Sequence, residues 1–417
     1  MEYQIMKDTV FIRLPERINA DNAETVEKEI FDISIPDNIT DIVLDASELR
    51  YISSMGLRIL LKMLKHNKQN VKLTEVSSDV YGILEATGFD TLLNAAKALR
   101  YVNTEKLEEL GRGMYGSVYR LDDEKILKVF HGLQSRDRAE EILKTVRTVF
   151  MSGIPTIIPY ETVRTDAGIG MVFEKLGSKS MADLIHQNPG FVEEYSEKMV
   201  KLARIMATTE FEKDEIESRK DMLHAELKSE AFILTDDEYN ELASYIDAVP
   251  DRNTGVHGDF HAGNVYILDG EALMIDMDDF ALGHPIWDMA CLYRVYPYLL
   301  GIDRPTAEAL FGLPPELEYE DFYFKIMHMS FEEAKSFWES FVDGYFSDYS
   351  EEQVKRFMET SQFYSDFMVV RFVVNQCIMV KDNPKELKKR RTLMRTLMDR
   401  MREKNVEELI GNLDEWK

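Results

Sequence analysis

The chain has 417 residues, and at about 150 residues per domain this length predicts two or three folded units. Hydrophobic residues make up 45% of the sequence and charged residues 30%, ordinary values for globular proteins that argue against disorder and low-complexity repeats. The 50 Lys and Arg against 76 Asp and Glu give a formal net charge of −26, which repels nucleic acid phosphates and anionic membranes. We therefore expect neither a nucleic acid nor a membrane partner.

Cysteine usage and the N-terminus indicate the compartment. Cys291 and Cys377 lie far apart, which argues against a disulfide framework and against a cysteine-based zinc site. The N-terminus lacks a basic segment before an apolar stretch, and no run of about 18 apolar residues occurs. We therefore expect a cytoplasmic protein.

The first hundred residues alternate strand-like and helix-like segments at short intervals. In chain order we expect a strand at 9–14, a helix at 22–33 capped by Asp21 or Asn22, a strand at 39–44, a helix opening at 53–56, a strand at 71–76 and a helix at 80–86 closed by Gly88. Strands that alternate with helices predict a small α/β domain with a partly parallel sheet.

The remainder predicts a second unit with two unequal lobes. Extended segments around glycines dominate its beginning, and helical periodicities dominate its end. Long helices are expected at 181–206, 235–246, 331–346 and 351–380. We therefore expect an α+β multidomain protein: an α/β domain at 1–103, a β-rich lobe with a hinge at 104–176 and an α-rich lobe at 177–417.

The segment 111–118 carries Gly111, Gly113 and Gly116, a spacing shared by dinucleotide-binding turns and kinase glycine-rich loops. A dinucleotide fingerprint opens a helix after its last glycine, whereas here the chain continues as a strand, turns at two aspartates and returns as an apolar strand containing Lys128. We therefore expect a hairpin whose glycines let the backbone approach a triphosphate, with Lys128 directed at the phosphates. An ordinary hairpin turn is the alternative.

A second polar cluster follows further along the chain. Asp259 and Asn264 have the spacing of the kinase catalytic loop, in which an aspartate accepts the proton of the substrate hydroxyl and an asparagine holds magnesium. Asp276 follows on its own apolar strand. Phosphoryl transfer needs a cation that bridges phosphate oxygens and a carboxylate that orients the nucleophile, so these three side chains suit it if they converge. A polar turn with solvated carboxylates is the alternative.

Three stretches carry a resemblance to a known family: HGDFHAGN at 257–264, IDMDD at 275–279 and GHPIWD at 283–288. Together they closely resemble the aminoglycoside phosphotransferase and choline kinase group of protein-kinase-like enzymes, and the resemblance spans about 105–417. It implies a bilobal kinase-like fold and a magnesium-dependent transfer of phosphate from ATP or GTP to a hydroxyl of a small molecule.

The resemblance also implies roles for individual residues. It makes Asp259 the catalytic base, Asn264 and Asp276 the Mg²⁺ ligands, and Lys128 the lysine that binds the phosphates. It implies further nucleotide contacts from the glycine-rich loop, the salt-bridge partner of the lysine and the inter-lobe hinge, at Gly111, Gly113, Gly116, Val118, Glu141, Glu174 and Leu176. Glu140 is the alternative partner of Lys128.

Three other polar residues of these stretches are expected to be structural. The family carries Gly-Asp-Pro-x-x-Asp after the metal aspartate; here His284 replaces the first aspartate and Asp288 is retained, so Asp288 is expected to support the catalytic loop. His257 and His261 have no third ligand at a fitting spacing, so they are expected to order the catalytic loop and not to bind a metal.

The first unit has a resemblance of its own. Asp45 at a strand end, followed by ISSMGL at 52–57, resembles the STAS domains of bacterial anti-sigma-factor antagonists. In those proteins a serine at the helix N-terminus is the phosphorylation switch, and alignment on Gly56 puts that switch at Ser54. Ser53 stands where an aspartate is usual, so either serine could serve only as an N-cap. The resemblance implies a module that binds a protein partner or a second copy of the chain.

Two other functions are alternatives: a regulatory nucleotide-binding protein of the partner-switching type, and a protein kinase that acts on a STAS serine. The acceptor is expected to be a small molecule. Acidic side chains between Glu210 and Asp251 would suit a cationic acceptor, although surface solvation explains them equally well. The basic run at 385–402 is expected to be a solvated helix face, with docking on the acidic rest of the chain as the alternative.

Overall fold

The computed structural model describes the 417 residues except 37, 114–115, 131–135, 178, 412 and 417. The chain forms two compact units. The N-terminal unit comprises residues 1–104 with 162–166, and the C-terminal unit comprises residues 105–161 with 167–417. Across the described residues, no helix has the length and the apolar character that a membrane span requires.

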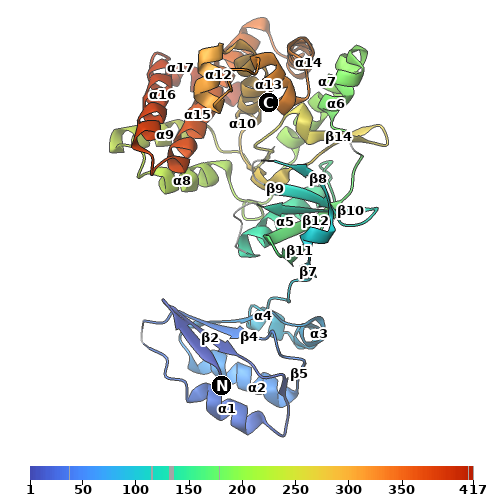
Figure 1. Ribbon diagram of the computed structural model, residues 1–417, viewed down its shortest axis with the longest axis vertical. Coiled ribbons are helices and arrows are strands. Elements are labelled where there is room, and N and C mark those ends of the chain that lie inside the picture. Colours follow the sequence, from blue (N-terminus) through green and yellow to red (C-terminus); the bar gives the residue numbers. More distant parts are fainter. Residues whose placement is uncertain (37, 114–115, 131–135, 178, 412, 417) are drawn as a thin grey trace. The chain divides into compact units, whose positions relative to one another are not determined.

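A four-stranded sheet of order β1-β2-β4-β6 organises the N-terminal unit (Figure 1). β1 is antiparallel to β2, and β2, β4 and β6 are parallel, as the alternating pattern predicts. The elements are β1 (Tyr3–Met6), β2 (Thr9–Arg13), β3 (Arg17–Ile18), α1 (Ala23–Phe31), β4 (Asp41–Asp45), β5 (Tyr51–Ile52), α2 (Ser54–His66), β6 (Asn70–Thr74), α3 (Ser78–Thr87), α4 (Phe89–Leu92) and β7 (Tyr101–Val102). The sequence does not predict β1, whose four residues are all exposed.

The helix ends of this unit follow the expected residues with one difference. Asn22 is the N-cap residue of α1, but its Oδ1 accepts the backbone N–H of Asn19 at 2.9 Å, so it makes no side-chain cap. Ser53 caps α2 by accepting the N–H of Gly56 at 3.4 Å, and Ser54 is the exposed first residue of that helix. Gly88 ends α3 with a φ of 71°, a conformation that favours glycine.

The sheet of the small lobe contains the neighbouring strands β11, β12, β10, β9 and β8, in that order. The pairs β8–β9, β9–β10 and β10–β12 are antiparallel, so the expected hairpin is present. Its elements are β8 (Glu108–Arg112), β9 (Gly116–Arg120), β10 (Lys125–Phe130), α5 (Arg136–Met151), β11 (Pro159–Thr165) and β12 (Gly168–Glu174). Met114 and Tyr115, which complete the glycine-rich segment, lie outside the described residues.

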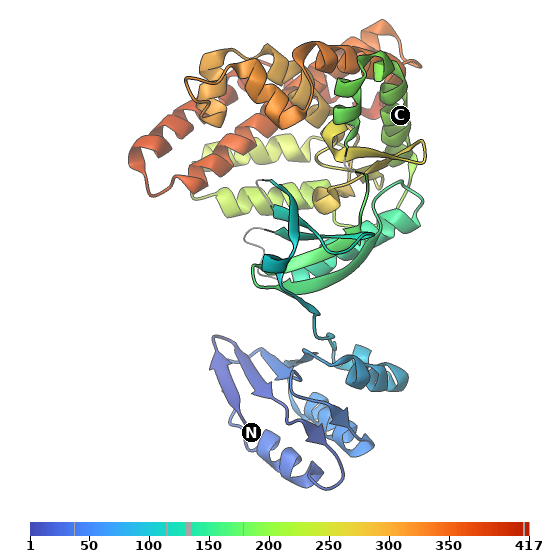
Figure 2. The same ribbon diagram turned by 45° about the vertical axis from the view of Figure 1, so that its right-hand side comes forward.

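The large lobe is mainly helical, and short strands interrupt it where the polar motifs lie (Figure 2). Before and around the motifs lie α6 (Met181–Gln187), α7 (Val192–Thr208), α8 (Arg219–Glu230), α9 (Asp236–Asp247), β13 (Gly255–Val256), β14 (Val265–Leu268), β15 (Glu271–Met274) and β16 (Ala281–Leu282). After them lie α10 (Ile286–Tyr293), the π-helix η5 (Arg294–Tyr298), α11 (Leu299–Gly301), α12 (Arg304–Phe311), α13 (Tyr319–Met327), α14 (Phe331–Tyr345), α15 (Glu351–Met379), α16 (Pro384–Arg402) and α17 (Val406–Ile410).

The basic run at the C-terminus forms α16, and part of it docks on acidic helices. Arg395 pairs with Glu238 at 2.7 Å, and Arg402 donates to Glu241 at 2.9 Å. Both glutamates lie on α9. The docking alternative therefore holds for these two arginines, because their guanidinium groups meet carboxylates of the same lobe.

The last residues of the chain pack into the core of the large lobe. The Trp416 side chain is fully buried, and its ring centroid lies 4.7 Å from that of Phe357 and 5.3 Å from that of Phe346. Its indole N–H donates to the Tyr345 hydroxyl at 3.4 Å, and the Arg252 guanidinium donates to its backbone carbonyl. The C-terminus thus contributes apolar surface to the lobe.

Phe357→Ala is expected to lower the free energy of unfolding of the C-terminal unit by about 3–5 kcal/mol, because it leaves a cavity among buried rings. Phe232→Ala is the control, since that ring is 63% exposed, and it should change this energy by less than about 0.5 kcal/mol. Trp287, Trp338 and Trp416 all lie in this unit, so tryptophan fluorescence in a urea titration reports its unfolding. Equal shifts of the two midpoints would contradict this packing.

Candidate active site

Among the three glycines in and before β9, only Gly116 lies where the neighbouring backbone leaves no room for a side chain. A Cβ on Gly116 would lie 2.7 Å from the Val129 carbonyl oxygen, so only glycine fits there. Gly111 has no heavy atom within 4 Å of such a Cβ, and for Gly113 the nearest is the Gly116 oxygen at 3.9 Å. At Gly111 and Gly113, therefore, the described contacts do not by themselves require glycine. Val118 lies directly opposite Lys128 in the β9–β10 register.

A buried carboxylate holds the start of the catalytic loop, residues 257–264. Asp288 lies in the first turn of α10, and its two oxygens accept the backbone N–H groups of His257 and Gly258, each at 2.9 Å. Burial raises the pKa of Asp288, although these bonds favour the ionised form. Gly258 has a φ of 87°, and a Cβ there would lie 2.8 Å from the Asp279 carbonyl oxygen. Asp288 thus supports the loop, as expected.

The two histidines of the loop make local contacts. His257 Nδ1 accepts the Asp259 N–H at 3.3 Å, so its Nε2–H donates to the Ile275 carbonyl at 2.9 Å. His261 Nδ1 accepts the Gly263 N–H at 3.1 Å. His257 therefore connects the loop to the strand that precedes Asp276, and both histidines order the backbone as expected.

Asp259 lies among donors from three directions. The Arg294 guanidinium donates to Oδ1 at 3.2 Å, the Asn264 amide donates to Oδ2 at 3.2 Å, and His261 Nε2 lies 3.5 Å from Oδ2. Burial alone would raise the pKa of Asp259, but His261 and Arg294 outweigh it and hold the pKa well below its usual range. The sequence does not single out Arg294; its only signal is a charged residue after the apolar stretch of α10.

Lys128, on β10 of the small lobe, contacts Asp276, the second of the two residues expected to bind Mg²⁺. Its ammonium contacts the carboxylates of Asp276 and Asp278. Burial would lower the lysine pKa, but the two aspartates outweigh it and raise that pKa. Glu141 pairs with Arg138 at 3.4 Å. Glu140 likewise pairs with an arginine of its own helix, so among the described contacts neither glutamate pairs with Lys128.

The backbone of Asp276 adopts an unusual conformation. Asp276 has φ 60° and ψ 52°, a left-handed conformation that is uncommon outside glycine and is concentrated at functional sites.

At the expected hinge, Glu174 Oε1 accepts the Ile158 N–H at 2.7 Å. Leu176 is partly buried and packs against the core of the lobe. The Glu174 side chain therefore connects the hinge to Ile158, the residue that precedes β11.

Asn264 and Asp276 have the donor chemistry of a magnesium site. The Asn264 amide nitrogen donates to the Asp259 carbonyl at 2.9 Å, which leaves the amide oxygen as the coordinating atom. The backbone carbonyl of Asn264 accepts the Ile275 N–H at 2.9 Å. Asp276 therefore follows directly on a residue that is hydrogen-bonded to Asn264. Among the described residues no three His, Cys, Asp or Glu side chains form a metal-binding group. Mg²⁺ binds through one or two carboxylates plus substrate phosphates, so these residues fit it with a nucleotide present.

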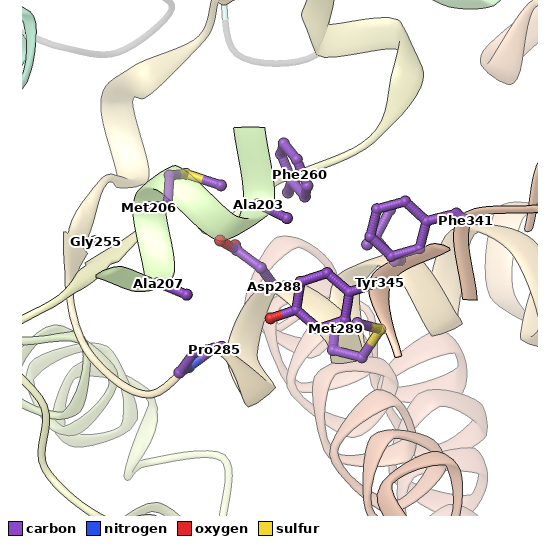
Figure 3. Close-up of a pocket in the computed structure, with 11 residues that line it drawn as sticks. Ala203, Met206, Ala207, Gly255, Phe260, Pro285, Asp288, Met289, Phe341 and Tyr345 are labelled. Atoms are coloured by element: carbon purple, nitrogen blue, oxygen red, sulfur yellow. The ribbon is translucent and has the colours of Figure 1, made fainter. Parts of the chain in front are cut away.

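Two hollows in the large lobe are not lined by Lys128, Asp259, Asn264 or Asp276. The cavity behind the catalytic loop, which Asp288, Phe260 and Tyr345 help to line, has a volume of about 10 Å³ (Figure 3). This volume is no larger than one water molecule needs, so the cavity cannot hold an acceptor. A larger groove of about 450 Å³ lies between α7 and α14 and contains none of the expected site residues.

The loop before α10 carries the histidine that departs from the family pattern. His284 Nδ1 accepts the Ile286 N–H at 3.0 Å, and its Nε2–H donates to the Leu413 carbonyl at 3.0 Å. Burial, with the nearby Arg252, lowers the pKa of His284 to about 3. His284 is therefore a neutral connection between the C-terminal segment and the helix that carries Asp288.

Comparisons with known proteins agree with the resemblances stated above. A model described as the phosphotransferase enzyme family matches residues 106–318, and a model of the STAS domain matches residues 1–102. A search of curated protein sequences finds no match. The expected order of a STAS domain followed by a phosphotransferase domain is thereby confirmed.

Several solved structures are similar to the chain at low identity. The ADP-bound aminoglycoside phosphotransferase APH(2'')-Ib is 13% identical, over 81% of this chain and 98% of that one, with a TM-score of 0.44. Amicoumacin kinase hAmiN, in complex with AMP-PNP, Ca²⁺ and Ami, is 16% identical, over 77% and 93%, with a TM-score of 0.46. A choline/ethanolamine kinase family protein from Mesorhizobium loti is 16% identical, over 74% and 92%, with a TM-score of 0.42.

His284→Asn is expected to remove part of the acid sensitivity of the C-terminal unit. The folded pKa of His284 lies below its unfolded value, so the unfolded chain binds a proton that the folded chain excludes, and stability falls as the pH drops below about 6.5. When the pH falls from 7 to 5, the unfolding free energy of the wild type should fall by about 2 kcal/mol more than that of the variant. Urea titrations at both pH values measure this shift, and a difference that does not change with pH would contradict a neutral, buried His284.

Proposed function

The chain belongs to the phosphotransferase enzyme family, and from this premise we propose that it transfers the γ-phosphoryl group of ATP or GTP to a hydroxyl of a small molecule. The observation that carries the proposal is the set of contacts among Lys128, Asp259, Asn264 and Asp276 described above. These residues come from three separate segments. Their contacts support the proposal, because phosphoryl transfer needs a carboxylate, oxygen ligands for a cation and an ammonium close to one another.

In this proposal Asp259 orients the acceptor hydroxyl and receives its proton as the hydroxyl oxygen bonds to the γ-phosphorus. The bond from that phosphorus to the oxygen bridging it to the β-phosphate breaks, and ADP or GDP leaves. Lys128 leaves Asp276 and pairs with the phosphates, since it is the buried ammonium beside the metal ligands. Asn264 and Asp276 would hold Mg²⁺, which would supply positive charge to the phosphate oxygens. Asp288 keeps Asp259 in place through the two backbone N–H groups that precede it.

The small lobe is proposed to bind the rest of the nucleotide. Gly111, Gly113 and Gly116 let the backbone approach the phosphates, and the backbone at Glu174 and Leu176 takes the adenine edge. Val118 lines the nucleotide from β9, opposite Lys128. A pairing of Lys128 with Glu141, or with Glu140, requires these glutamates to exchange their arginine partners when nucleotide binds.

The N-terminal unit is proposed as a regulatory STAS module that binds a protein partner or a second copy of the chain. Ser54 is its proposed phosphorylation site, because it is exposed at the start of α2, where unpaired N–H groups favour an added phosphate. We propose domain limits of 1–103, 104–176 and 177–417. A bacterial cytoplasm suits the two free, buried cysteines, Cys291 and Cys377.

Asp259→Ala is expected to reduce phosphate transfer at least 100-fold and to leave nucleotide affinity within about threefold, because Asp259 acts on the acceptor and not on the triphosphate. Asn264→Ala is the contrasting variant: it should weaken nucleotide binding only when Mg²⁺ is present, since it removes one metal ligand. Calorimetric titrations with ATP and with GTP, with and without Mg²⁺, and a screen for ADP or GDP release over alcohols, sugars and amino sugars measure both effects.

The same variants separate the proposal from its alternatives. Equal turnover of wild type and Asp259→Ala would remove Asp259 from the mechanism. Tight nucleotide binding by the wild type with no transfer to any acceptor would favour a regulatory nucleotide-binding protein. Phosphate appearing on the protein itself would favour a protein kinase.

Ser54→Asp is expected to change self-association or partner binding without unfolding the module, because a negative charge is favourable at a helix N-terminus. Ser78→Asp is a matched control, since Ser78 is the exposed first residue of α3. Sedimentation velocity of the full chain compares the two variants with wild type, and circular dichroism checks the fold. Identical distributions for Ser54→Asp and Ser78→Asp would count against a phosphorylation switch in self-association.

A further inference from the structure

The helix that carries Asp288 is followed by an unusual turn. η5 (Arg294–Tyr298) is π-helical, and Pro297 lies inside it. π turns are rare, occur mostly as single turns within helices and are frequent at functional sites. Pro297 supplies no N–H group to the turn. The directions of the side chains in η5 show what this turn does.

Two side chains of η5 contact the catalytic loop. The Arg294 guanidinium donates to Asp259 Oδ1 at 3.2 Å, and the Tyr296 hydroxyl accepts the Ala262 N–H at 3.1 Å. Tyr296 is fully buried, whereas 30% of the Arg294 side chain is exposed. One residue of the turn therefore fixes the loop backbone, and another reaches the carboxylate that is proposed to receive the acceptor.

Arg294 places a permanent positive charge at Asp259, because a guanidinium does not lose its proton in proteins. On the other carboxylate oxygen, His261 Nε2 lies at 3.5 Å and the Asn264 amide donates at 3.2 Å. The protein itself thus supplies groups to both oxygens of Asp259. The negative charge of Asp259 is compensated before any acceptor binds.

Five of the acidic side chains between Glu210 and Asp251 are paired in a similar way. Lys220 pairs with Asp251 at 2.9 Å. Other pairs connect α8 and α9 to arginines of α15 and α16, namely Glu226 and Glu230 with Arg371, Glu238 with Arg395 and Glu241 with Arg402. These carboxylates have protein partners, so they do not require a cationic acceptor to explain them.

An anionic acceptor meets the opposite difficulty. Asp276, Asp278 and Asp279 lie together directly after β15, and the chain as a whole carries a formal net charge of −26. The phosphates of a bound nucleotide add further negative charge. Repulsion between like charges weakens only slowly with distance where water is excluded.

From these contacts we infer that the acceptor is an uncharged alcohol or sugar, and that Arg294 is the positioning residue that selects it. The inference deepens the proposed function and rests on it. A cationic acceptor would bring its charge toward the Arg294 guanidinium as its hydroxyl approaches Asp259. An uncharged hydroxyl needs only a lone pair of the carboxylate, which Arg294 keeps in place.

Two matched series of acceptors test the inference: glucose, glucosamine and glucuronate, and glycerol, 3-amino-1,2-propanediol and glycerate. The measurement is kcat/KM for phosphate transfer by the full chain at saturating nucleotide and Mg²⁺. We expect the uncharged member to exceed the cationic member at least tenfold in the wild type. Arg294→Gln should reduce this ratio at least tenfold, and Arg294→Lys, which retains the charge, should restore most of it.

Lys335→Gln is the charge control, because that side chain is 72% exposed on α14. It should leave the ratio unchanged. A wild-type preference for a charged member, an equal loss for all members in Arg294→Gln, or no transfer to any uncharged member while Mg²⁺-dependent nucleotide binding persists would each overturn the inference. Loss of nucleotide binding by the wild type would instead overturn the proposed function.

Discussion

The Asp288 carboxylate accepts the backbone N–H groups of His257 and Gly258, and the position of Asp259 depends on these two hydrogen bonds. A buried carboxylate is costly unless its oxygens are satisfied, so Asp288 and the loop backbone stabilise each other. His257 extends the same arrangement to the strand before Asp276 through the Ile275 carbonyl.

Residues near the C-terminus help to hold the helix that carries Asp288. His284 bonds to the N–H of Ile286 and to the carbonyl of Leu413, so the start of α10 is tied to the C-terminal segment. Trp416, three residues further on, lies in the aromatic core and fixes that segment. The proposed active-site loop at about residue 260 is therefore positioned partly by residues more than 150 positions later, so packing of the C-terminal segment and order in the loop are coupled.

The sequence predicts the parts of this protein that depend on local spacing. The strand–turn–strand pattern of the glycine-rich segment and the order of Asp259, Asn264 and Asp276 need only neighbouring residues to be recognised. The Arg294 contact could not be predicted, because an apolar stretch ending in RVYPY indicates an ordinary helix and a π turn changes the direction of the side chains that follow. The present partners of Lys128 also escaped prediction, since which carboxylate meets a lysine depends on the placement of α5 and of the turn after β15.

Charge compensation is the basis of the neutral character inferred for the acceptor. An excess of carboxylates is tolerated where they meet cations of the same lobe, as Glu238 and Glu241 meet arginines of α16. At Asp259 the same principle acts on a single carboxylate, whose partner Arg294 comes from the turn after α10. A fixed guanidinium costs nothing to reorganise when an uncharged hydroxyl arrives, whereas a charged acceptor has to offset its own desolvation and the repulsion of one of the two fixed charges. The internal ion pair therefore favours hydroxyl groups that bring no charge of their own.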